Sequence, residues 1–257
     1  MSAVSASEMR VAVVTGGGSG IGRAIVEAFA HAGYQTMIAD VNETDSQALA
    51  ESLNTQSLQA RYLRLDVADA DNIAHFFATV EREYGRCDVL VNNAGIAKTV
   101  AYLDYPQDHW EKVMQVNVTG PFLMSQHAGR LMQKRQSGRI INIASVSGER
   151  ASWGRAAYGT SKAAIFGLTR QMALELAEFG ITSNGIAPGP IDTPLTRQLH
   201  TQAARDAFTL SVPMGRYGTP QEIAQVCLFL ASDAASYVNG HVIPVDGGFL
   251  AAGITGH

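Results

Sequence analysis

The sequence predicts a single α/β domain in which two layers of helices cover a parallel β-sheet. Short apolar runs rich in β-branched residues alternate along the chain with longer amphipathic stretches. The apolar runs are continuous and lack the alternation of apolar and polar residues that marks a strand with one face in water. Strands that are buried on both faces and alternate with helices form a doubly wound parallel sheet, which is the fold class that we expect.

The expected strands are short apolar runs bounded by polar or small residues. In chain order they are residues 11–14, 36–39, 61–65, 88–91, 139–143, 181–187 and 241–245. The stretches between them have the periodicity of helices with one buried face. The expected helices are residues 20–32, 44–53, 71–84, 108–117, 119–136, 156–179 and 220–231.

We expect one domain over residues 1–257, because the chain contains no linker, repeat or low-complexity tract. Residues 1–9 are small and polar, and we expect them to be flexible. Residues 190–218 are the longest stretch with little apolar periodicity. In a compact domain such a stretch is typical of a lid or binding loop, so we interpret residues 190–218 as a substrate lid.

Composition excludes several classes of function. The 257 residues are 46% hydrophobic and 16% charged, which is ordinary for a globular domain, and the formal charge of −4 disfavours a nucleic-acid or anionic-membrane surface. The chain contains no run long and apolar enough for a signal or membrane segment. Cys87 and Cys227 lie far apart in apolar stretches, which favours buried thiols over a disulfide. A cytoplasmic protein is therefore expected.

The seven histidines are scattered and form no set with ligand spacing, so we predict no catalytic metal. His200 lies in the expected lid, where a solvated histidine is the simpler interpretation.

A glycine-rich segment follows the first expected strand directly and opens the first expected helix. Gly16, Gly20 and Gly22 have the spacing G-x-x-x-G-x-G, which differs from the G-x-G-x-x-G of the standard dinucleotide fingerprint. Glycine permits a tight turn and lets backbone N–H groups at a helix N-terminus approach a pyrophosphate. A plain turn with a helix cap is the alternative, but the place between strand and helix favours a dinucleotide site in a Rossmann-like fold.

Asp40 ends the second expected strand. A carboxylate at this position can accept hydrogen bonds from both hydroxyls of an adenosine ribose, and it repels a 2′-phosphate. An NADP site would favour a basic residue nearby, whereas the corresponding positions are Ser19 and Val41. We therefore predict NAD as the cofactor in preference to NADP, with a turn residue as the alternative interpretation of Asp40.

Polar and small residues also end the third and fourth expected strands. Asp66 and Val67 follow one of them, and Asn92-Asn-Ala-Gly95 follows the other. The carboxyl ends of parallel strands meet at one edge of a doubly wound sheet, where ligands bind. Small residues at 94 and 95 would let a planar cofactor lie close to the backbone.

Tyr158 and Lys162 lie four residues apart in an expected helix and so share one of its faces. A free phenol titrates near about 10, too high for a general base at neutral pH, and an adjacent ammonium lowers that pKa. Ser145, just past the fifth expected strand, can hydrogen-bond a substrate oxygen, and Asn117 can anchor a water that leads from Lys162 toward solvent. An exposed helical pair is the alternative interpretation of Tyr158 and Lys162 alone.

Taken in order, these motifs resemble the short-chain dehydrogenase/reductase family, in its branch of roughly 250 residues. The matching positions are Thr15-Gly-Gly-Gly-Ser-Gly-Ile-Gly22, Asp66, Asn92-Asn-Ala-Gly95, Asn117, Ser145, Tyr158-Gly-Thr-Ser-Lys162 and Pro188-Gly189. They extend over nearly the whole chain, and no catalytic position departs from the pattern. The resemblance implies a sheet of seven strands and a catalytic tetrad of Asn117, Ser145, Tyr158 and Lys162.

By the same resemblance, Tyr158 is the general acid/base, Ser145 steadies the substrate oxygen, Lys162 tunes Tyr158 and binds the nicotinamide ribose, and Asn117 completes a proton relay. The implied reaction interconverts a secondary alcohol and its ketone. The expected cofactor-binding residues are Gly16, Ser19, Gly20, Ile21, Gly22, Asp40, Asp66, Val67, Asn93, Gly95, Tyr158, Lys162, Pro188, Ile191 and Thr193. The last strand and Asp246-Gly-Gly248 resemble the segment through which such proteins build homotetramers.

The substrate is less well determined. Ser145, Tyr158 and Trp153 are the expected substrate-binding residues, and a Trp face with charged neighbours suits a polyol or sugar acid. Apolar positions in the lid would also admit a hydrophobic alcohol. The main hypothesis is an NAD-dependent dehydrogenase for such alcohols, and the alternative is a 3-oxoacyl-thioester reductase, which Arg150, Arg155 and Arg197 keep open. A binding protein that senses dinucleotides without catalysis is a remote third hypothesis.

Overall fold

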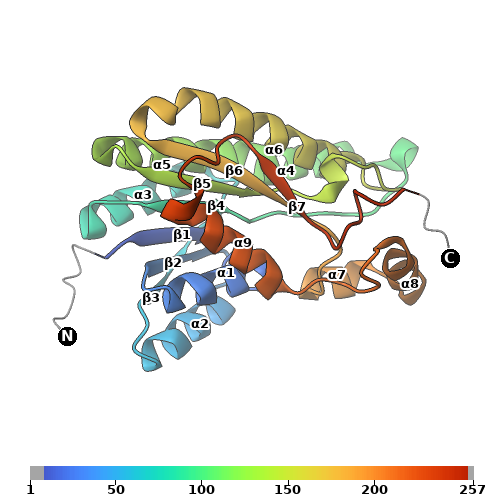
Figure 1. The fold of residues 1–257 in the computed structure, drawn as a ribbon, viewed down its shortest axis with the longest axis horizontal. Helices are drawn as coiled ribbons and strands as arrows, with labels where there is room; N and C mark the ends of the chain where they lie inside the picture. The colour runs from blue at the N-terminus through green and yellow to red at the C-terminus, as the bar shows by residue number, and fades with distance from the viewer. Residues whose placement is uncertain (1–8, 254–257) are drawn as a thin grey trace.

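The computed structural model describes residues 9–253. Of the segment 1–9, which was expected to be flexible, residues 1–8 lie outside the described residues. Seven strands form one sheet in the order β3-β2-β1-β4-β5-β6-β7, and every pairing is parallel. The strands are β1 (Val11–Thr15), β2 (Gln35–Asp40), β3 (Ala60–Arg64), β4 (Val89–Asn92), β5 (Gly138–Ile143), β6 (Ile181–Pro188) and β7 (Val242–Val245). The predicted Rossmann-like fold class is confirmed (Figure 1).

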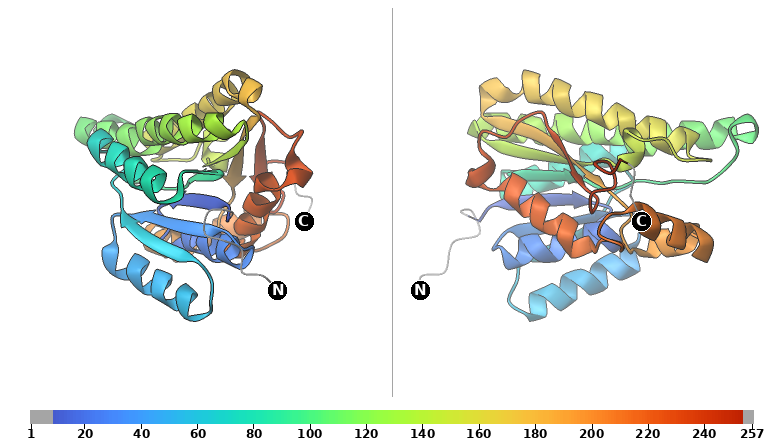
Figure 2. Two further views of the ribbon diagram at one scale, coloured as in Figure 1. Left: turned by 90° about the vertical axis from the view of Figure 1, so that its left-hand side faces the viewer. Right: turned by 45° about the vertical axis from the view of Figure 1, so that its right-hand side comes forward.

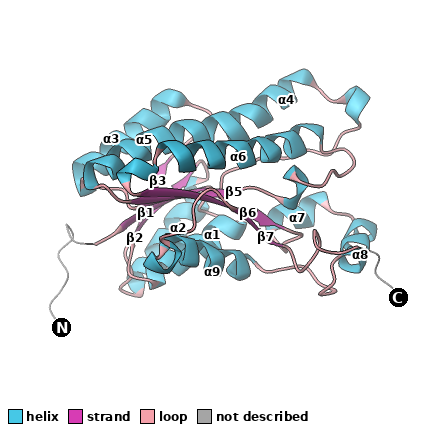
Figure 3. Cartoon of the chain, turned by 45° about the horizontal axis from the view of Figure 1, so that its top comes forward, coloured by secondary structure: helices cyan, strands magenta, loops and turns pink. Residues whose placement is uncertain are grey.

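Helices cover both faces of the sheet (Figures 2 and 3). One layer contains α1 (Gly20–His31), α2 (Glu43–Thr55) and α9 (Pro220–Ala231), and the other contains α3 (Ala70–Tyr84), α4 (Gln107–Met114), α5 (Gly120–Arg135) and α6 (Ala156–Glu175). Two apolar cores fill the spaces between the sheet and these layers. Phe29 and Leu230 are buried in the first core, and Phe77 and Met124 are buried in the second. Cys87 and Cys227 are buried free thiols, as the sequence predicted.

The strand order places a crevice beside β1. The chain moves outward from β1 through β2 to β3 and then returns to β4, on the other side of β1. The loops that follow β1 and β4 therefore leave the sheet toward opposite faces. In doubly wound folds this point, at the carboxyl ends of the strands, is where ligands bind.

The two helices expected over residues 108–117 and 119–136 form one continuous helical segment. A π-helical turn, η2 (Gln115–Thr119), joins α4 to α5, and the Gly120 N–H bonds to the Gln115 carbonyl, five residues back. The extra residue in this turn rotates the side chains of α5 about the helix axis relative to those of α4. Apolar periodicity does not reveal such a turn, and π-turns often occur at functional positions.

Residues 190–218 contain more regular structure than their periodicity suggested. Two short helices, α7 (Pro194–Leu199) and α8 (Gln202–Ser211), lie beyond the carboxyl ends of β6 and β7 (Figure 1). Threonines cap both helices at their N-termini, Thr193 for α7 and Thr201 for α8. Side-chain caps stabilise short helices that bury little apolar surface, which explains why the hydrophobic pattern missed them.

Helix α6 ends at Glu175, although the sequence predicted a helix to residue 179. A short 3-10 turn, η4 (Ala177–Phe179), follows, and Gly180 then takes a φ of +68°. Further 3-10 turns are η1 (Tyr102–Asp104), η3 (Val146–Gly148) and η5 (Asp233–Ala235). Within residues 9–253, no helix combines the length and the apolarity needed to cross a bilayer.

The first core provides a test of what holds the fold together. Phe29 is fully buried and meets the Tyr34 ring edge-on, with centroids 5.0 Å apart. Replacing Phe29 with Ala leaves a cavity, and we expect the free energy of unfolding to fall by about 3–5 kcal/mol in urea denaturation. Tyr102, which is 79% exposed, is the matched control, and Tyr102→Ala should change stability by less than about 0.5 kcal/mol. Equal losses in the two variants would contradict the assigned packing.

Candidate active site

The glycine segment after β1 forms a tight backbone cradle. Gly16 has a φ of +63°, and a Cβ there would lie 3.0 Å from the Ala94 Cα. A Cβ on Gly22 would overlap the Gly16 carbonyl oxygen. Ser19 is the N-cap of α1, yet its side chain makes no capping bond and the first turn contains no acidic residue. The N-terminus of α1 thus fits an anionic pyrophosphate, because neither a side chain nor a carboxylate competes for it.

Asn93 and Thr15 fasten this cradle to the end of β4. The Asn93 side-chain amide donates to the carbonyls of Thr15 and Gly16, at 2.9 and 3.0 Å. The Thr15 hydroxyl accepts the N–H groups of Asn93 and Ala94, at 2.9 and 3.0 Å. Asn93, an expected cofactor contact, holds the glycine loop in place through its side-chain amide.

Asp40 lies at the end of β2 and faces the glycine loop. Its two carboxylate oxygens accept the N–H groups of Gly18 and Asn42, each at 2.9 Å. A Cβ on Gly18 would lie 2.5 Å from the Ser46 hydroxyl oxygen and 3.1 Å from the Asp40 carboxylate, so glycine favours this approach. The negative charge therefore stands where the loop would present the ribose of an adenine nucleotide, and the residues present fit such a group.

The expected contacts after β3 and β4 lie at the same edge of the sheet. Asp66 accepts the Ala68 N–H at 2.9 Å, which fixes the turn that contains Val67. A Cβ on Gly95 would lie 3.4 Å from the Asn117 Oδ1 and 3.6 Å from the Lys162 Nζ. Gly95 thus brings the backbone after β4 next to two of the expected catalytic side chains.

Asn117 is buried in the π-turn η2, with 1% of its surface exposed. Its side chain pairs with the backbone of Ile96, accepting the N–H at 2.9 Å and donating to the carbonyl at 3.0 Å. It also donates to the Ser161 hydroxyl at 3.0 Å. The π-turn therefore directs Asn117 at the loop after β4 and at α6 together.

Lys162 and Tyr158 project from α6 into the same buried region. The Lys162 ammonium donates to the Ile143 carbonyl at 2.7 Å and lies 5.7 Å from the centroid of the Tyr158 ring. Burial lowers the pKa of Lys162 to about 8. Burial also raises the pKa of Tyr158, and the Ser145 hydroxyl and the Arg155 charge act against that rise.

The pKa of Tyr158 differs from the sequence-based expectation that Lys162 would lower it. Removal of the phenol from water outweighs the opposing effects of the Ser145 hydroxyl and the Arg155 charge, while the Lys162 ammonium donates to the Ile143 carbonyl.

Ser145 follows β5 and packs against α6. It is 7% exposed, and its hydroxyl accepts the Ser147 N–H at 3.1 Å. The close packing requires Gly148, where a Cβ would lie 2.7 Å from the Lys162 carbonyl carbon. The structure thus brings Asn117, Ser145, Tyr158 and Lys162 together from η2, the end of β5 and α6.

The residues after β6 border the glycine cradle. A Cβ on Gly20 would lie 3.6 Å from the Thr193 side chain, so the N-terminus of α7 meets the N-terminus of α1. Ile191 is 4% exposed and accepts the Thr196 hydroxyl at 2.7 Å. Pro188 ends β6 beside Val245 of β7. These expected cofactor contacts lie on the side of the cradle opposite Asp40.

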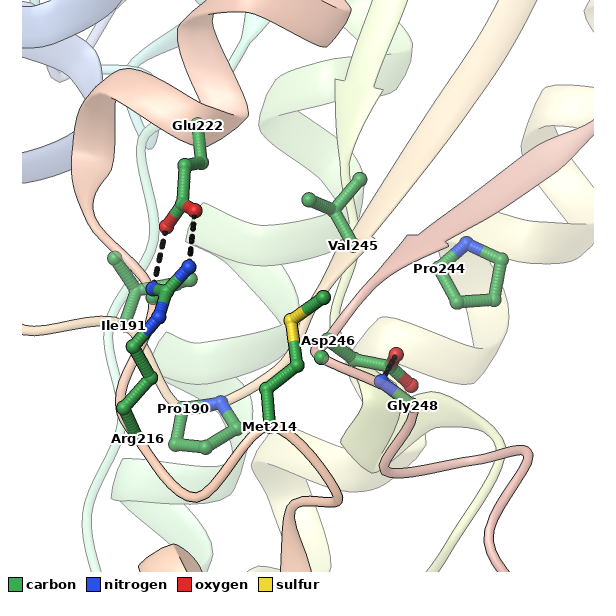
Figure 4. Close-up of a pocket in the computed structure, with 11 residues that line it drawn as sticks. Pro190, Ile191, Met214, Arg216, Glu222, Pro244, Val245, Asp246 and Gly248 are labelled. Carbon is green, nitrogen blue, oxygen red and sulfur yellow. Dashed lines mark hydrogen bonds and ion pairs between the residues drawn. The ribbon is translucent and has the colours of Figure 1, made fainter.

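Two features lie apart from this constellation. Trp153 is 78% exposed, so an expected substrate contact points away from buried surface. A hollow of about 330 Å³ between Pro190 and β7 is lined by Met214, Pro244 and the Arg216–Glu222 ion pair, and none of the four expected catalytic residues lines it (Figure 4). Within residues 9–253, no cluster of three or more His, Cys, Asp or Glu could hold a metal ion.

Sequence reasoning missed a buried amide network beneath the site. Asn92 donates to the Ser125 hydroxyl and to Asn142, at 3.0 and 2.9 Å, and Asn142 donates to the Thr169 hydroxyl at 3.0 Å. The network joins β4 and β5 to α5 and α6 below the expected catalytic residues. A polar residue inside the apolar run 139–143 was the available signal.

The likeness to known proteins agrees with this geometry. A family model described as Enoyl-(Acyl carrier protein) reductase matches residues 16–250. The chain is 39% identical over 243 residues to the 3-oxoacyl-[acyl-carrier-protein] reductase FabG of Thermotoga maritima, covering 95% of this chain and 98% of the relative. The crystal structure of gox2181 superposes with a TM-score of 0.93 at 38% identity, over 95% of this chain and 96% of that one.

A second solved structure is similar to the same extent. It is a gluconate 5-dehydrogenase from Burkholderia cenocepacia J2315 in complex with NADP and tartrate, with a TM-score of 0.91 at 37% identity, over 95% of this chain and 96% of that one.

Fold and site together define an NAD(P)-binding oxidoreductase with a doubly wound sheet. The chain belongs to the short-chain dehydrogenase/reductase family, whose members act on CH–OH groups.

The Asn93 clamp on the glycine loop yields a test by dinucleotide binding. Asn93→Ala removes the hydrogen bonds to the carbonyls of Thr15 and Gly16, and we expect the Kd for NADH, measured by nucleotide fluorescence, to rise about tenfold. Asn54→Ala is the matched control, because the Asn54 amide also makes two bonds to one backbone segment, at Ala60, but far from the cradle. An unchanged Kd in Asn93→Ala would show that the loop holds its shape without the clamp.

Proposed function

We propose that this protein interconverts a secondary alcohol and its ketone with NAD(H), using Tyr158 as the general acid/base. The observation that carries the proposal is the convergence of a half-buried phenol with a buried ammonium, hydroxyl and amide at the carboxyl edge of the sheet, next to a glycine cradle with a carboxylate beyond it. A purely structural role would not require four such groups from three separate parts of the fold.

The proposed roles follow from the contacts of each residue. Bound nicotinamide would supply the acceptor or donor of the hydride. In the oxidative direction Tyr158, as phenolate, removes the hydroxyl proton, and in the reductive direction it returns that proton. The Ser145 hydroxyl, close enough to lower the pKa of the phenol, also hydrogen-bonds the substrate oxygen.

Lys162 supports Tyr158 through charge and proton exchange. With a pKa of about 8, the ammonium is cationic at neutral pH and can still release a proton without a large cost. Asn117 bonds to the loop after Gly95 and to the Ser161 hydroxyl. It therefore lies where it could anchor a water that leads from Lys162 toward solvent. Lys162 and Asn117 thus serve as the inner end of a proton path.

The preference for NAD rests on Asp40. Its carboxylate, already held by the glycine loop, would meet a 2′-phosphate with like charge, and Ser19 provides no compensating cation. Basic side chains near an adenosine ribose are the usual means of accepting that phosphate. The NADP of the Burkholderia enzyme belongs to that protein, and the position of Asp40 supports the opposite preference here.

A second candidate is a 3-oxoacyl-thioester reductase. The observation in its favour is the similarity to the Thermotoga reductase over almost the full length of both chains. Exposed apolar side chains of residues 190–218, namely Leu195, Leu210 and Met214, would suit an acyl chain. The first candidate has the support of the gluconate 5-dehydrogenase structure and of Asp40.

We also propose that residues 190–218 close over substrate as a lid and that the chain assembles as a homotetramer in the cytoplasm. Helices α7 and α8 stand at the carboxyl edge of the sheet, where such closure would occur (Figure 2). The groove between α5 and α6, flanked by the exposed Phe122, and the exposed Phe229 of α9 are surfaces that a second copy would cover. Free buried cysteines suit a reducing compartment.

The role of Tyr158 predicts both a loss of turnover and a pH dependence. Tyr158→Phe should lower kcat by about 10²–10⁴-fold while NADH binds as in the wild type. Because burial raises the pKa of Tyr158 and oxidation needs the phenolate, the oxidation rate should rise from pH 7 to about pH 10, while the reduction rate, which needs the protonated phenol, should stay level over that range and fall only above it. Tyr84→Phe, on the remote helix α3, is the control. Oxidation that is fastest at low pH would rule out this role.

The cofactor and substrate assignments are tested together by absorbance at 340 nm. Purified protein is given NAD or NADP with secondary alcohols and polyols, and NADH or NADPH with 3-oxoacyl thioesters. We expect alcohol oxidation with NAD, and Asp40→Ser should lower the NAD/NADP ratio of kcat/KM about tenfold or more, whereas Asp71→Ser on α3 should not. Activity only with NADPH and oxoacyl thioesters would establish the second candidate and remove the NAD preference.

A further inference from the structure

A half-buried arginine stands between the lid and Tyr158. Arg155 precedes the first turn of α6, and its guanidinium lies 5.7 Å from the centroid of the Tyr158 ring. On its other side the Nη2 atom bonds the His200 Nε2 at 3.4 Å. His200 ends α7, so Arg155 touches both the expected lid and the proposed acid/base.

The lid holds His200 in one protonation state. A guanidinium has only donors, so the Nε2 of His200 must accept, and the ring proton lies on Nδ1. The Nδ1–H then donates to the Tyr217 hydroxyl at 2.9 Å. The Phe208 ring stacks on His200, with centroids 5.0 Å apart and planes 15° apart. Burial, with the Arg155 and Arg205 charges, lowers the pKa of His200, which agrees with a neutral ring.

The charge of Arg155 lacks a carboxylate partner within residues 9–253. The arginines of the lid, by contrast, are each paired with a carboxylate. Arg197 and Arg205 pair with Asp192, at 2.8 and 3.2 Å, and Arg216 pairs with Glu222 at 2.7 Å. The bond to His200 is the one hydrogen bond that the Arg155 side chain makes in this part of the chain. A partly buried guanidinium with free N–H donors is costly unless an anion binds it.

We propose that Arg155, held by His200, binds the carboxylate of the substrate, so that the alcohol oxidised is that of a hydroxy acid. This inference rests on the proposed function and narrows its substrate class. The distance to the Tyr158 ring requires the carboxylate to lie within a few bonds of the reacting carbon. Hydroxy acids meet that condition, whereas the phosphate of a thioester carrier lies at the far end of a long arm. His200 is a positioning residue that aims the guanidinium.

The test compares hydroxy acids with neutral partners of the same carbon skeleton. Gluconate is paired with sorbitol, and 2- and 3-hydroxybutyrate are each paired with their ethyl esters, in the presence of NAD. We expect kcat/KM to favour each acid that is turned over by about tenfold or more over its neutral partner. Arg155→Met should raise the KM for the acid about 100-fold and leave the KM for the neutral partner within about twofold. The change in kcat should be smaller and shared by both substrates, because the Arg155 charge also acts on Tyr158.

His200 and a surface arginine provide the controls. His200→Leu should raise the KM for the acid about tenfold, and His200→Gln, whose amide can both accept and donate, should restore it. Arg82→Met on α3 removes one positive charge at a site 67% exposed and should change nothing. Calorimetry of acid binding to the inactive Tyr158→Phe variant, with and without Arg155→Met, measures the same interaction without turnover.

The outcomes separate the two proposals. If the neutral partners are oxidised as well as the acids and Arg155→Met changes neither, the alcohol dehydrogenase stands and the carboxylate site is wrong. The same conclusion follows if Arg155→Met lowers kcat/KM for acids and neutral partners equally, since the arginine would then act on Tyr158 alone. If none of these compounds is turned over or bound while oxoacyl thioesters are reduced, both proposals are wrong.

Discussion

The clamp between the ends of β1 and β4 is the constraint on which the rest of the site depends. Thr15 and Asn93 join the glycine loop to the backbone after β4 by hydrogen bonds in both directions. The strand order leaves a crevice at this junction, and the clamp fixes the shape of its floor. The clamp thereby sets the position of the glycine loop, in which Gly18 approaches Asp40. It also sets the position of the backbone after β4, in which Gly95 approaches Lys162.

Burial sets the chemistry of the reacting groups. Burial disfavours the charged form of both Tyr158 and Lys162, which raises the pKa of the phenol and lowers that of the ammonium to about 8. The Lys162 ammonium is then the stronger acid of the two, so it can return a proton to a Tyr158 phenolate. The amide network of Asn92 and Asn142 joins β4 and β5 to α5 and α6 by neutral hydrogen bonds, so it adds no further charge beneath the site.

Specificity is divided between the two ends of the crevice. Asp40 stands at the nucleotide end, where its charge is stabilised by backbone N–H groups of the glycine loop. Arg155 stands at the substrate end, where His200 holds it but no carboxylate of the described chain neutralises it. The lid arginines that pair with Asp192 and Glu222 are, by contrast, structural. In the proposed function, the cofactor and the substrate are therefore recognised by side chains of opposite charge.

The sequence by itself determined the parallel sheet, most element positions and the identity of the groups at the carboxyl edge, because continuous apolar runs, glycine spacing and strand-end polar residues are local signals. Tertiary structure alone decided the π-turn that aims Asn117, the helices of the lid, the clamping role of Asn93 and the exposure of Trp153. It also decided that burial, and not Lys162, governs the pKa of Tyr158, and that Arg155 meets His200. Those features depend on contacts between residues far apart in the chain, which periodicity and spacing do not encode.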